Sequence, residues 1–480
     1  MKKQLLFILA LSLYIGTRAH AQAPESEDVL LQGFYWDSQK VTGWTQMLSY
    51  SEEISHVFTG VWLPPSASAE NGGAVGDANV GYHPRLWNDQ TSCWGTAADL
   101  KALIADFHSR GVKVMADIVV NHRAGYTDWA NFPVDDFGQY GTYQLTLADV
   151  CQDDEVNTAA GAATFRQKYG RATGEKDTGD KWDGARDLDH TSTNVQADVT
   201  AYLQWMRGEM GYDGWRYDLV KGFNGKYVAQ YNEASSPWLS VGECFDYSYD
   251  VCKNWLEQAN YKSTCFDFPA KNAAINSGLA KGNFSNMSWV EMETGIWRPA
   301  GLIHHFSTNR YAVTFIDNHD TYRESDKKYT GDILQAHAFM LSAPGIPCVF
   351  WPHWIQYRQQ IAKMVSCRHL AGLHSQSDVT VTQRSSYYEC LSKGKLGNLI
   401  CRIGTSAPTT VPEGYFTAAS GNGWAYYLSE NLHEAYTGIS ETGLSANPQS
   451  AEYYDLQGRR TKAVPRQGVV IQNGKKVIMF

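Results

Sequence analysis

Four short segments of the sequence place charged or amide side chains directly after runs of apolar residues. In one segment Arg216 and Asp218 stand two positions apart, so on a strand their side chains lie on one face, opposite Trp215 and Tyr217. A buried structural ion pair would also explain this segment taken alone. The other segments carry Asp117 with Asn121 and His122, Glu243, and the run from Asp317 to Asp320. Four such strand ends at one edge of a sheet are hard to explain by packing and predict a functional site.

Two of these carboxyl groups have surroundings that favour opposite protonation states. Arg216, on the same face as Asp218, favours the ionised form of that carboxylate, which suits a nucleophile. Glu243 lies in the apolar segment 241–245, with no cation near it in the sequence. Burial there would raise its pKa and keep it protonated, which suits a general acid that later acts as a general base.

The elements that must hold these groups alternate between strands and helices, which is typical of a parallel sheet. Eight strands are predicted, at residues 29–36, 56–63, 112–120, 213–219, 239–244, 263–267, 311–317 and 346–351. Helices are predicted at residues 44–54, 96–110, 192–209, 224–234, 332–342 and 355–373. Eight strands in this rhythm predict the α/β class and a (β/α)8 TIM barrel, with its functional groups at the C-terminal ends of the strands.

The predicted barrel occupies residues 22–122 and 187–375. It is interrupted by the Gly-, Asp- and Thr-rich stretch 123–186, which predicts an irregular inserted subdomain after the third strand. Short alternating strands predict a C-terminal antiparallel β-sandwich domain at 376–450. The basic segment 451–480 contains Asn473-Gly474 between two apolar runs, a signal for a type I′ hairpin. We interpret it as a C-terminal hairpin that could serve as a sorting or extension segment.

Composition and the N-terminal residues bound the cellular context. The formal net charge of −9 argues against nucleic acid or an anionic membrane as partner. Lys2 and Lys3, the apolar run 5–15 and Ala19-His20-Ala21 predict a signal peptide, residues 1–21, cleaved after Ala21. The apolar run is too short to span a bilayer, so we expect no integral membrane segment after its removal. A secreted, periplasmic or cell-surface location follows.

The sequence has nine cysteines, an odd number, scattered and without metal-type spacing. They predict no disulfide framework, although a few pairs could be oxidised. We expect most of them to be small buried apolar residues.

The four polar segments resemble the four signature regions of the α-amylase family of glycoside hydrolases, family 13. They are residues 117–122, 214–222, 242–243 and 315–320, in the family's order and approximate spacing. The flanking segments 61–65 and 345–350 are most similar to plant-type α-amylases and their bacterial relatives. The resemblance covers roughly residues 28–405, and residues after about 450 resemble C-terminal segments of exported proteins of the Bacteroidetes.

The resemblance implies roles for individual residues. Such enzymes cleave an acetal through an oxocarbenium-like transition state, and a retaining mechanism needs two carboxyl groups about 5–5.5 Å apart. The implied catalytic residues are Asp218 as nucleophile, Glu243 as acid and base, and Asp320 as the carboxylate that holds sugar hydroxyls. The implied substrate-binding residues are Tyr82, His122, Arg216, Lys221 and His319. Asp117 is expected to pair with Arg216 rather than to act in catalysis.

The resemblance also implies a Ca²⁺ ion between the barrel and the insertion. Ca²⁺ prefers carboxylate and carbonyl oxygens. Asn121, Asp187 and the carbonyl of Gly222 match family positions that hold it, and Asp177 is the predicted ligand from the insertion. Asp180 and Asp183 are alternatives to Asp177. The family usually has proline where this chain has Arg186, so this loop departs from the pattern.

These observations predict a secreted α-amylase that hydrolyses internal α-1,4 bonds of starch, glycogen or maltooligosaccharides with retention of configuration. A monomer is expected. An exo-acting maltooligosaccharide-forming amylase or a transglycosylase of the same family is an alternative, since the same three carboxyl groups serve both. An alternative of another class is a non-catalytic starch-binding protein, which would have no use for a protonated glutamate beside an ionised aspartate.

Overall fold

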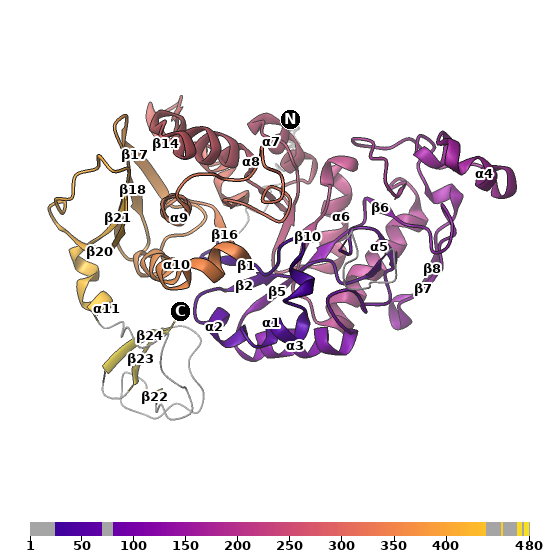
Figure 1. Cartoon of the computed structure of the whole chain (residues 1–480), viewed down its shortest axis with the longest axis horizontal. Helices are drawn as coiled ribbons and strands as arrows, with labels where there is room; N and C mark the ends of the chain where they lie inside the picture. Colours follow the sequence, from indigo (N-terminus) through magenta and orange to yellow (C-terminus); the bar gives the residue numbers. More distant parts are fainter. Residues whose placement is uncertain (1–24, 70–79, 438–452, 455–467, 473–474, 480) are drawn as a thin grey trace, which may run out of the picture.

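The computed structural model describes residues 25–69, 80–437, 453–454, 468–472 and 475–479. The predicted signal peptide, with its cleavage site after Ala21, and the Asn473-Gly474 turn lie outside these residues. The molecule is elongated, with the barrel between the insertion at one end and the C-terminal sheet at the other (Figure 1).

Eight parallel strands close into a barrel, which confirms the predicted fold class. Strand β1 (Leu30–Gln32) pairs with both β2 (Gly60–Trp62) and β16 (Ile346–Phe350), and these two pairings close the ring. The other strands are β5 (Lys113–Ile118), β10 (Gly214–Tyr217), β11 (Ser240–Gly242), β12 (Thr264–Phe266) and β15 (Ala312–Thr314). Because all of them run in one direction, their C-terminal ends meet at one mouth.

Strand β10 separates aromatic and charged side chains between its two faces, as its sequence predicts. Trp215 and Tyr217 are fully buried and point toward helix α6 (Gly225–Ser235). The indole of Trp215 donates to Ser235 Oγ at 2.9 Å, and the phenol of Tyr217 donates to Asn232 Oδ1 at 3.0 Å. Arg216 therefore points into the barrel.

Helices cover the outside of the barrel. They include α3 (Ala97–Ser109), α5 (Thr193–Trp205), α9 (Ile333–Ser342) and α10 (Trp351–Ala371), at or near predicted positions, and α7 (Tyr249–Gln258), which was not predicted from the sequence. Helix α3 begins with a capping box between Thr96 and Asp99 and buries Leu100, Leu103, Ile104 and Phe107 on one face.

The single helix predicted at 44–54 is instead two short helices, α1 (Trp44–Leu48) and α2 (Ser51–Ser55). The hydroxyl of Ser49 donates to the carbonyl of Gln46, and that of Ser51 donates to the carbonyl of Leu48. Such local serine bonds compete with the backbone bonds of a continuous helix.

The insertion leaves and rejoins the barrel through a two-stranded neck. Strand β6 (His122–Arg123) pairs antiparallel with β9 (Arg186–Asp187), so residues far apart in the sequence become neighbours. Beyond the neck lie a hairpin of β7 (Val134–Asp136) and β8 (Thr142–Gln144) and the short helix α4 (Ala163–Tyr169).

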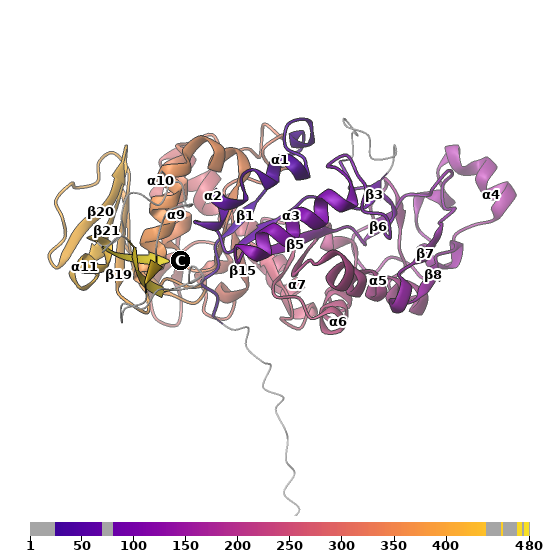
Figure 2. The ribbon, with the colours of Figure 1, turned by 90° about the horizontal axis from the view of Figure 1, so that it is seen from below.

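The C-terminal domain is an antiparallel sheet in the order β17-β18-β19-β21-β20. These strands are Asp378–Arg384, Tyr388–Lys393, Asn398–Ile403, Trp424–Ser429 and Tyr415–Gly421, in the same order. The sheet lies against α9 and α10, and Tyr426 donates a hydrogen bond to the Ala338 carbonyl in α9 at 2.6 Å. Figure 2 shows the sheet standing edge-on beside these helices.

The last strands, β22 (Tyr453–Tyr454), β23 (Gly468–Gln472) and β24 (Lys475–Met479), form a separate antiparallel sheet. Gln472 pairs with Lys475, which agrees with the predicted hairpin.

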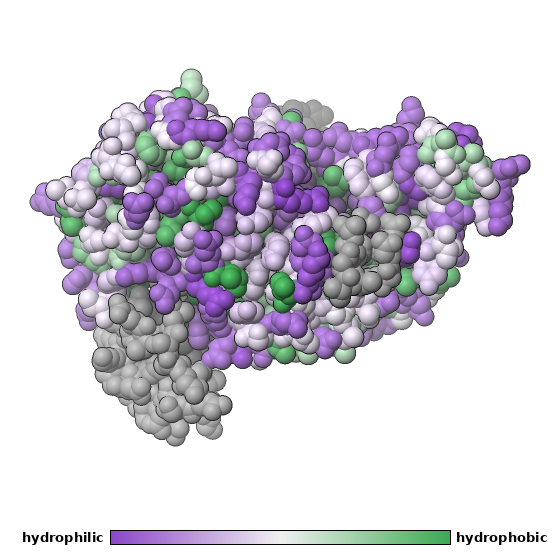
Figure 3. Space-filling model, in the orientation of Figure 1, coloured by the Kyte–Doolittle hydropathy of each residue, from purple (hydrophilic) through white to green (hydrophobic). Residues whose placement is uncertain are grey.

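The described helices include none with both the length and the apolar character to cross a bilayer. On the face seen in Figure 3, hydrophobic residues form small separate patches among hydrophilic ones.

Candidate active site

Arg216 is the centre of a buried ion-pair cluster at the mouth of the barrel. Its Nη1 lies 2.8 Å from Asp117 Oδ1 and 2.6 Å from Asp218 Oδ1. Its Nη2 lies 2.9 Å from Glu243 Oε2. The three carboxyl groups come from β5 and from the residues that directly follow β10 and β11. The predicted pairing of Asp117 with Arg216 is therefore confirmed.

Glu243 is held so that its protonated form is favoured. Burial raises its pKa well above the ordinary range, against the opposing charge of Arg216, and the negative charges of Asp218 and Asp320 raise it further. The backbone N–H of Leu219 donates to Glu243 Oε2 at 3.1 Å. Leu219 has φ 47° and ψ 47°, a left-handed conformation that costs an L-residue about 1–2 kcal/mol. This strained turn directs the N–H toward Glu243.

Asp117 is shielded from solvent more completely than Glu243. Trp62 Nε1 and Tyr82 Oη donate to its Oδ2 at 3.1 and 2.8 Å. Burial raises its pKa to about 7, although Arg216 opposes the shift. The side chain of Asp218 keeps 12% of its surface exposed and that of Glu243 keeps 7%, whereas that of Asp117 has none. Asp218 and Glu243 are therefore the members of the cluster that an incoming molecule can touch.

Asp320 stands at the end of a tightly bonded turn. Asn318 Oδ1 accepts from the backbone N–H groups of Asp320 and Thr321, at 3.0 and 2.8 Å. Behind it, Asp317 forms a fully buried ion pair with Lys271, with Nζ 2.7 Å from Oδ1. These bonds fix the direction of the Asp320 carboxyl group, which keeps 23% of its surface exposed.

The imidazole of His319 and the guanidinium of Arg323 both contact Asp320. Its Oδ2 lies 3.2 Å from His319 Nε2, and its Oδ1 lies 3.3 Å from Arg323 Nη2. Burial raises the pKa of Asp320, while Arg216 and Arg323 oppose the shift.

His319 is held in one tautomer by its partners. The Gln32 amide lies 3.0 Å from Nδ1, and Tyr82 Oη lies 2.8 Å from Nε2. Since the amide nitrogen of Gln32 donates and the Tyr82 hydroxyl already donates to Asp117, the imidazole proton belongs on Nε2. Burial and Arg216 lower the pKa of His319 well below its usual range, so the ring is neutral.

His122 is also neutral, because burial lowers its pKa to about 4. Its Nε2 lies 2.8 Å from the Tyr82 carbonyl oxygen, and its ring stacks on Trp182 with centroids 4.1 Å apart. The structure thus brings Tyr82, His122 and His319 together with Arg216, Asp218, Glu243 and Asp320.

Lys221 lies at the edge of this group. Its Nζ is 3.0 Å from Asp246 and 3.2 Å from Asp180, and its side chain is half-buried. Its predicted contact with substrate stays a prediction.

Sequence reasoning missed Trp36, which extends the aromatic wall of the site. Its ring plane is within 3° of that of Tyr82 and within 4° of that of His319. The Arg323 guanidinium lies 3.6 Å from its ring centroid. Trp36 stands four residues after the end of β1, and that position at the mouth of the barrel was a signal that could have identified it.

The predicted calcium ligands also lie together. Asn121 Nδ2 is 3.4 Å from Asp187 Oδ1, and a Cβ atom on Gly222 would meet Asn121 Oδ1 at 2.0 Å. A Cβ atom on Gly179 would meet the Lys221 carbonyl oxygen at 2.2 Å, so the loop after Asp177 runs against the backbone of residues 221–222. Glycine at 179 and 222 permits this close approach.

Two acidic groups at this place lack a compensating charge. Burial raises the pKa of Asp187 to about 8, and the neighbouring Asp177 raises it further. Asp177 Oδ2 is buried without a hydrogen-bond partner. By contrast, Asp180 and Asp183 are 70% and 64% exposed and pair with Lys221 and Lys181. A buried carboxylate oxygen with no partner fits a cation ligand, which favours Asp177 over its two alternatives.

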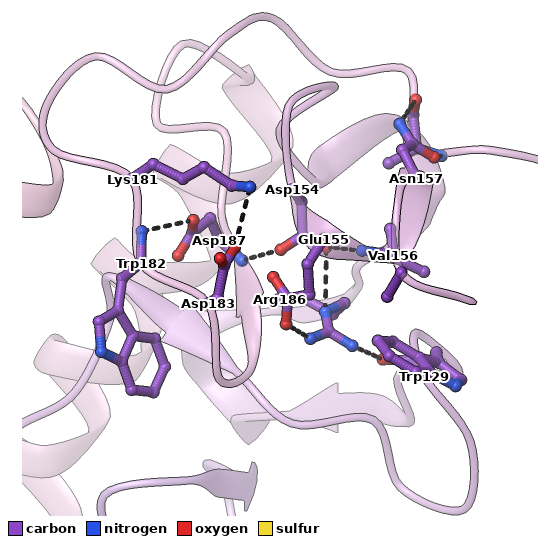
Figure 4. A network of polar contacts seen from close by, with 12 residues as sticks. Trp129, Asp154, Glu155, Val156, Asn157, Lys181, Trp182, Asp183, Arg186 and Asp187 are labelled. Atoms are coloured by element: carbon purple, nitrogen blue, oxygen red, sulfur yellow. Dashed lines mark hydrogen bonds and ion pairs between the residues drawn. The ribbon is translucent and has the colours of Figure 1, made fainter. Parts of the chain in front are cut away.

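Arg186 anchors the same loop (Figure 4). Its Nε lies 3.1 Å from Asp154 Oδ1, and its Nη2 contacts Glu155. The guanidinium lies 4.7 Å from the ring centroid of Trp129. Asp154 Oδ2 in turn accepts from the backbone N–H of Asp187 at 2.8 Å. The departure from proline at this position therefore supplies an ion pair that holds Asp187 in place.

The chain is similar in sequence to known proteins. The family profile described as "Alpha amylase, catalytic domain" matches residues 37–363. The chain is 31% identical over 373 residues to "Alpha-amylase 3, chloroplastic" of Arabidopsis thaliana, a match of 74% of this chain and 39% of that protein. It is 28% identical over 428 residues to "Probable alpha-amylase 2" of the same plant, a match of 84% and 94%. It is 25% identical over 442 residues to a glucan 1,4-alpha-maltotetraohydrolase of Roseateles saccharophilus, covering 84% and 72%.

Solved structures share the fold at lower identity. An Anoxybacillus α-amylase superposes with a TM-score of 0.55 at 18% identity, over 84% of this chain and 96% of the other. An α-amylase from Malbranchea cinnamomea gives 0.57 at 16% identity, over 85% and 97%. Similarity at this level concerns the fold alone.

Proposed function

We propose that this chain, which belongs to the α-amylase family of glycoside hydrolases, cleaves internal α-1,4-glucosidic bonds of starch- or glycogen-type glucans with retention of configuration. The observation that carries the proposal is the contact of one buried guanidinium, Arg216, with both Asp218 and Glu243, beside Asp320. Two carboxyl groups on the terminal nitrogens of one guanidinium form the close pair that a retaining glycosidase needs.

In the first step Glu243 donates its proton to the oxygen of the bond that breaks, while Asp218 attacks the anomeric carbon. The raised pKa of Glu243 supplies the proton at neutral pH. The Arg216 guanidinium contacts the Asp218 carboxylate that attacks and holds it in place. The product is a glycosyl ester on Asp218 and a released glucan end.

In the second step Glu243, now ionised, takes a proton from water, and that water displaces Asp218 from the sugar. Arg216 stabilises the negative charge on each carboxylate in turn, because it contacts both. The Leu219 N–H adds a hydrogen bond to the ionised Glu243.

The remaining residues of the site position the sugar in this proposal. Asp320 accepts hydrogen bonds from sugar hydroxyls, and neutral His122 and His319 exchange hydrogen bonds with the same ring without adding charge. Tyr82 supplies an aromatic face for that ring, and Trp36 extends it. Lys221 contacts the glucan on the leaving-group side, which requires it to turn from Asp180 and Asp246.

Ca²⁺ is part of the proposal, with Asn121, Asp177, Asp187 and the Gly222 carbonyl as its ligands. When bound, it supplies the positive charge that Asp177 and Asp187 lack, and it joins the insertion to the barrel. The insertion, residues 123–186, thereby positions Trp182 against His122. A monomeric, exported enzyme with residues 1–21 removed completes the proposal, on the N-terminal sequence features described above.

A second candidate is exo-acting release of a short maltooligosaccharide. It is favoured by the similarity to maltotetraose-forming relatives, at 25% identity for the protein of Roseateles saccharophilus and 23% for that of Stutzerimonas stutzeri. The same three carboxyl groups would carry out this reaction.

A time course on soluble starch distinguishes these activities. Iodine staining and reducing ends are followed together, with the wild type and Asp218→Asn. Rapid loss of staining per reducing end, abolished in the variant, is expected for the endo-acting enzyme. Slow loss of staining with one accumulating oligosaccharide would favour the exo-acting candidate. Starch that remains intact in the presence of the wild type would contradict both.

A further inference from the structure

Three cysteines that are irregularly spaced in the sequence lie close together beside the active site. The Sγ atoms of Cys244, Cys252 and Cys265 all lie within 4.8 Å of one another, and all three side chains are buried. The sequence predicts only scattered apolar cysteines, because intervals of this kind match no metal-binding motif. The fold brings the three sulfurs together from the end of β11, from α7 and from β12.

The backbone fixes the position of each sulfur. Cys265 pairs in register beside Gly242, across the two neighbouring strands β11 and β12. Cys252 lies on the inner face of α7, with Sγ 3.3 Å from the Asp246 carbonyl oxygen and 3.6 Å from that of Cys244. Cys244 follows Glu243 directly in the sequence. The cluster is therefore formed by one strand, one helix and the short segment that follows β11.

The chemistry of the cluster suits a soft cation. Thiolate sulfur selects thiophilic metals over Ca²⁺ or Mg²⁺. A cation at the centre of three sulfurs, with metal–sulfur bonds of about 2.3 Å, would hold the sulfurs about 4 Å apart. This distance lies within the observed limit of 4.8 Å and needs a small contraction at most.

We propose that Cys244, Cys252 and Cys265 form a binding site for one soft divalent cation of the Zn²⁺, Cd²⁺ and Hg²⁺ class, separate from the calcium ligands. Binding displaces the thiol protons of Cys244, Cys252 and Cys265 to solvent and forms three metal–sulfur bonds, with no change of oxidation state.

Occupancy of this site lowers glucan hydrolysis. Drawing Cys244 toward the other two sulfurs shifts the end of β11, and Glu243 is the preceding residue. A displacement of about 1 Å in an active site can cost about 100-fold in rate, so the smaller shift expected here should still lower the rate measurably. This consequence rests on the proposed role of Glu243, whereas the binding of the cation does not.

Cadmium tests the site, because its bonds to thiolate sulfur give a charge-transfer absorption in the ultraviolet that bonds to oxygen do not give. The full chain, kept reduced and then freed of reductant, is saturated with Ca²⁺ and titrated with Cd²⁺. We expect one Cd²⁺ per chain by native mass spectrometry, together with the absorption band and a loss of starch hydrolysis of at least tenfold that a chelator reverses.

Cys252→Ala and Cys265→Ser should lose the band and the tight binding, and each is checked for folding by its melting curve. Cys367→Ala, at a buried cysteine of α10 outside the cluster, should keep both.

Three results would overturn the site. The first is a wild-type protein that shows no sulfur-to-Cd²⁺ absorption band. The second is equal Cd²⁺ binding by all three variants, and the third is a wild-type protein whose mass shows an intramolecular disulfide and which takes up no metal. If Cys265→Ser does not fold, Cys252→Ala and the wild-type titration decide the question. Normal Cd²⁺ binding by a wild type that hydrolyses no starch would support the site and contradict the proposed function instead. Normal binding with full starch hydrolysis would support the site and contradict the inhibition.

Discussion

Arg216 and burial act in opposite directions on the carboxyl groups around it. The guanidinium favours the charged forms of Asp117 and Glu243, whereas their removal from water favours the neutral forms. Burial has the greater effect on both, so their pKa values rise. Asp218 keeps more contact with solvent than Glu243 does. Two carboxyl groups on one guanidinium can thus carry out different tasks.

We expect Asp218→Asn and Glu243→Gln each to reduce kcat on starch by about 10²–10⁴-fold or more, since each removes a group that acts in the transition state. In kcat/KM, which reports the first step, Glu243→Gln should lose far less on an aryl maltooligosaccharide than on starch, because a phenolate leaves without a proton. Asp218→Asn should lose activity on both substrates. Asp183→Asn, at an exposed aspartate, serves as the control and should match the wild type. Equal losses of kcat/KM for Glu243→Gln on the two substrates would contradict the role of Glu243 as acid.

The pH profile should reflect the raised pKa of Glu243. The active form carries a protonated Glu243, so kcat/KM falls as the pH rises through the pKa of that group in the folded protein. Because burial raises this pKa, the decline should lie well above the ordinary value of 4.5. Asp218→Asn removes one of the negative charges that raise the pKa, so Glu243 should titrate at lower pH in that variant, measured by its infrared carboxyl band. A decline near the ordinary value would disprove this account.

The short strand β9 of the neck is held in place largely by one side chain, that of Arg186. Strand β9 has two residues, too few to be stable through its own backbone bonds. Arg186 adds contacts with Asp154, Glu155 and Trp129, and all of these lie within the insertion.

Arg186→Ala should lower the free energy of unfolding by about 3–5 kcal/mol, because it leaves the buried Asp154 without its ion-pair partner. Lys181→Ala removes an exposed ion pair with Asp183 in the same loop and should cost about 0–1 kcal/mol. Thermal or urea unfolding of the two variants measures the difference. Similar small effects in both would show that Arg186 does not anchor the loop.

The molecule as a whole places its functional groups at the junction of parts that are distant in sequence. The carboxyl groups come from the barrel, while Trp182 and Asp177 come from the insertion. The C-terminal sheet lies at the other end, against α9 and α10, and Arg368 of α10 donates to the carbonyls of Leu341, Ala343 and Gly345. The junction with the insertion is therefore where a ligand can couple two parts of the fold.

Removal of Ca²⁺ should lower the melting temperature, since ligand binding to the folded state alone stabilises it. Asp177→Asn should weaken the response to added Ca²⁺, and Asp183→Asn should not, because Asp183 is exposed and paired with Lys181. Calorimetric melting curves with a chelator and with excess Ca²⁺ measure both effects. The same response in the two variants would rule out Asp177 as a ligand, and an unchanged melting curve in the wild type would remove the site.

The sequence predicts the barrel well because its strands are short, largely buried and mostly apolar runs, and several of them end in polar residues. Strand β10 is the clearest case, where alternation alone places Trp215 and Tyr217 outside and Arg216 inside. The sequence does not predict the division of α1 from α2, since serine hydroxyls decide it locally. Nor does it predict Lys271 as the partner of Asp317, because that pair joins residues 46 positions apart.

By itself, the sequence determined which strand ends carry charged and amide residues, because strand periodicity and polar strand ends are local properties. Only the tertiary structure decided which of these groups touch. It placed Asp218 and Glu243 on one guanidinium, turned the Leu219 N–H toward Glu243, and left Asp177 Oδ2 buried without a partner. It also gathered Cys244, Cys252 and Cys265. The reason is physical: the pKa and reactivity of a side chain depend on burial and on charges a few ångströms away, and those neighbours are set by long-range packing.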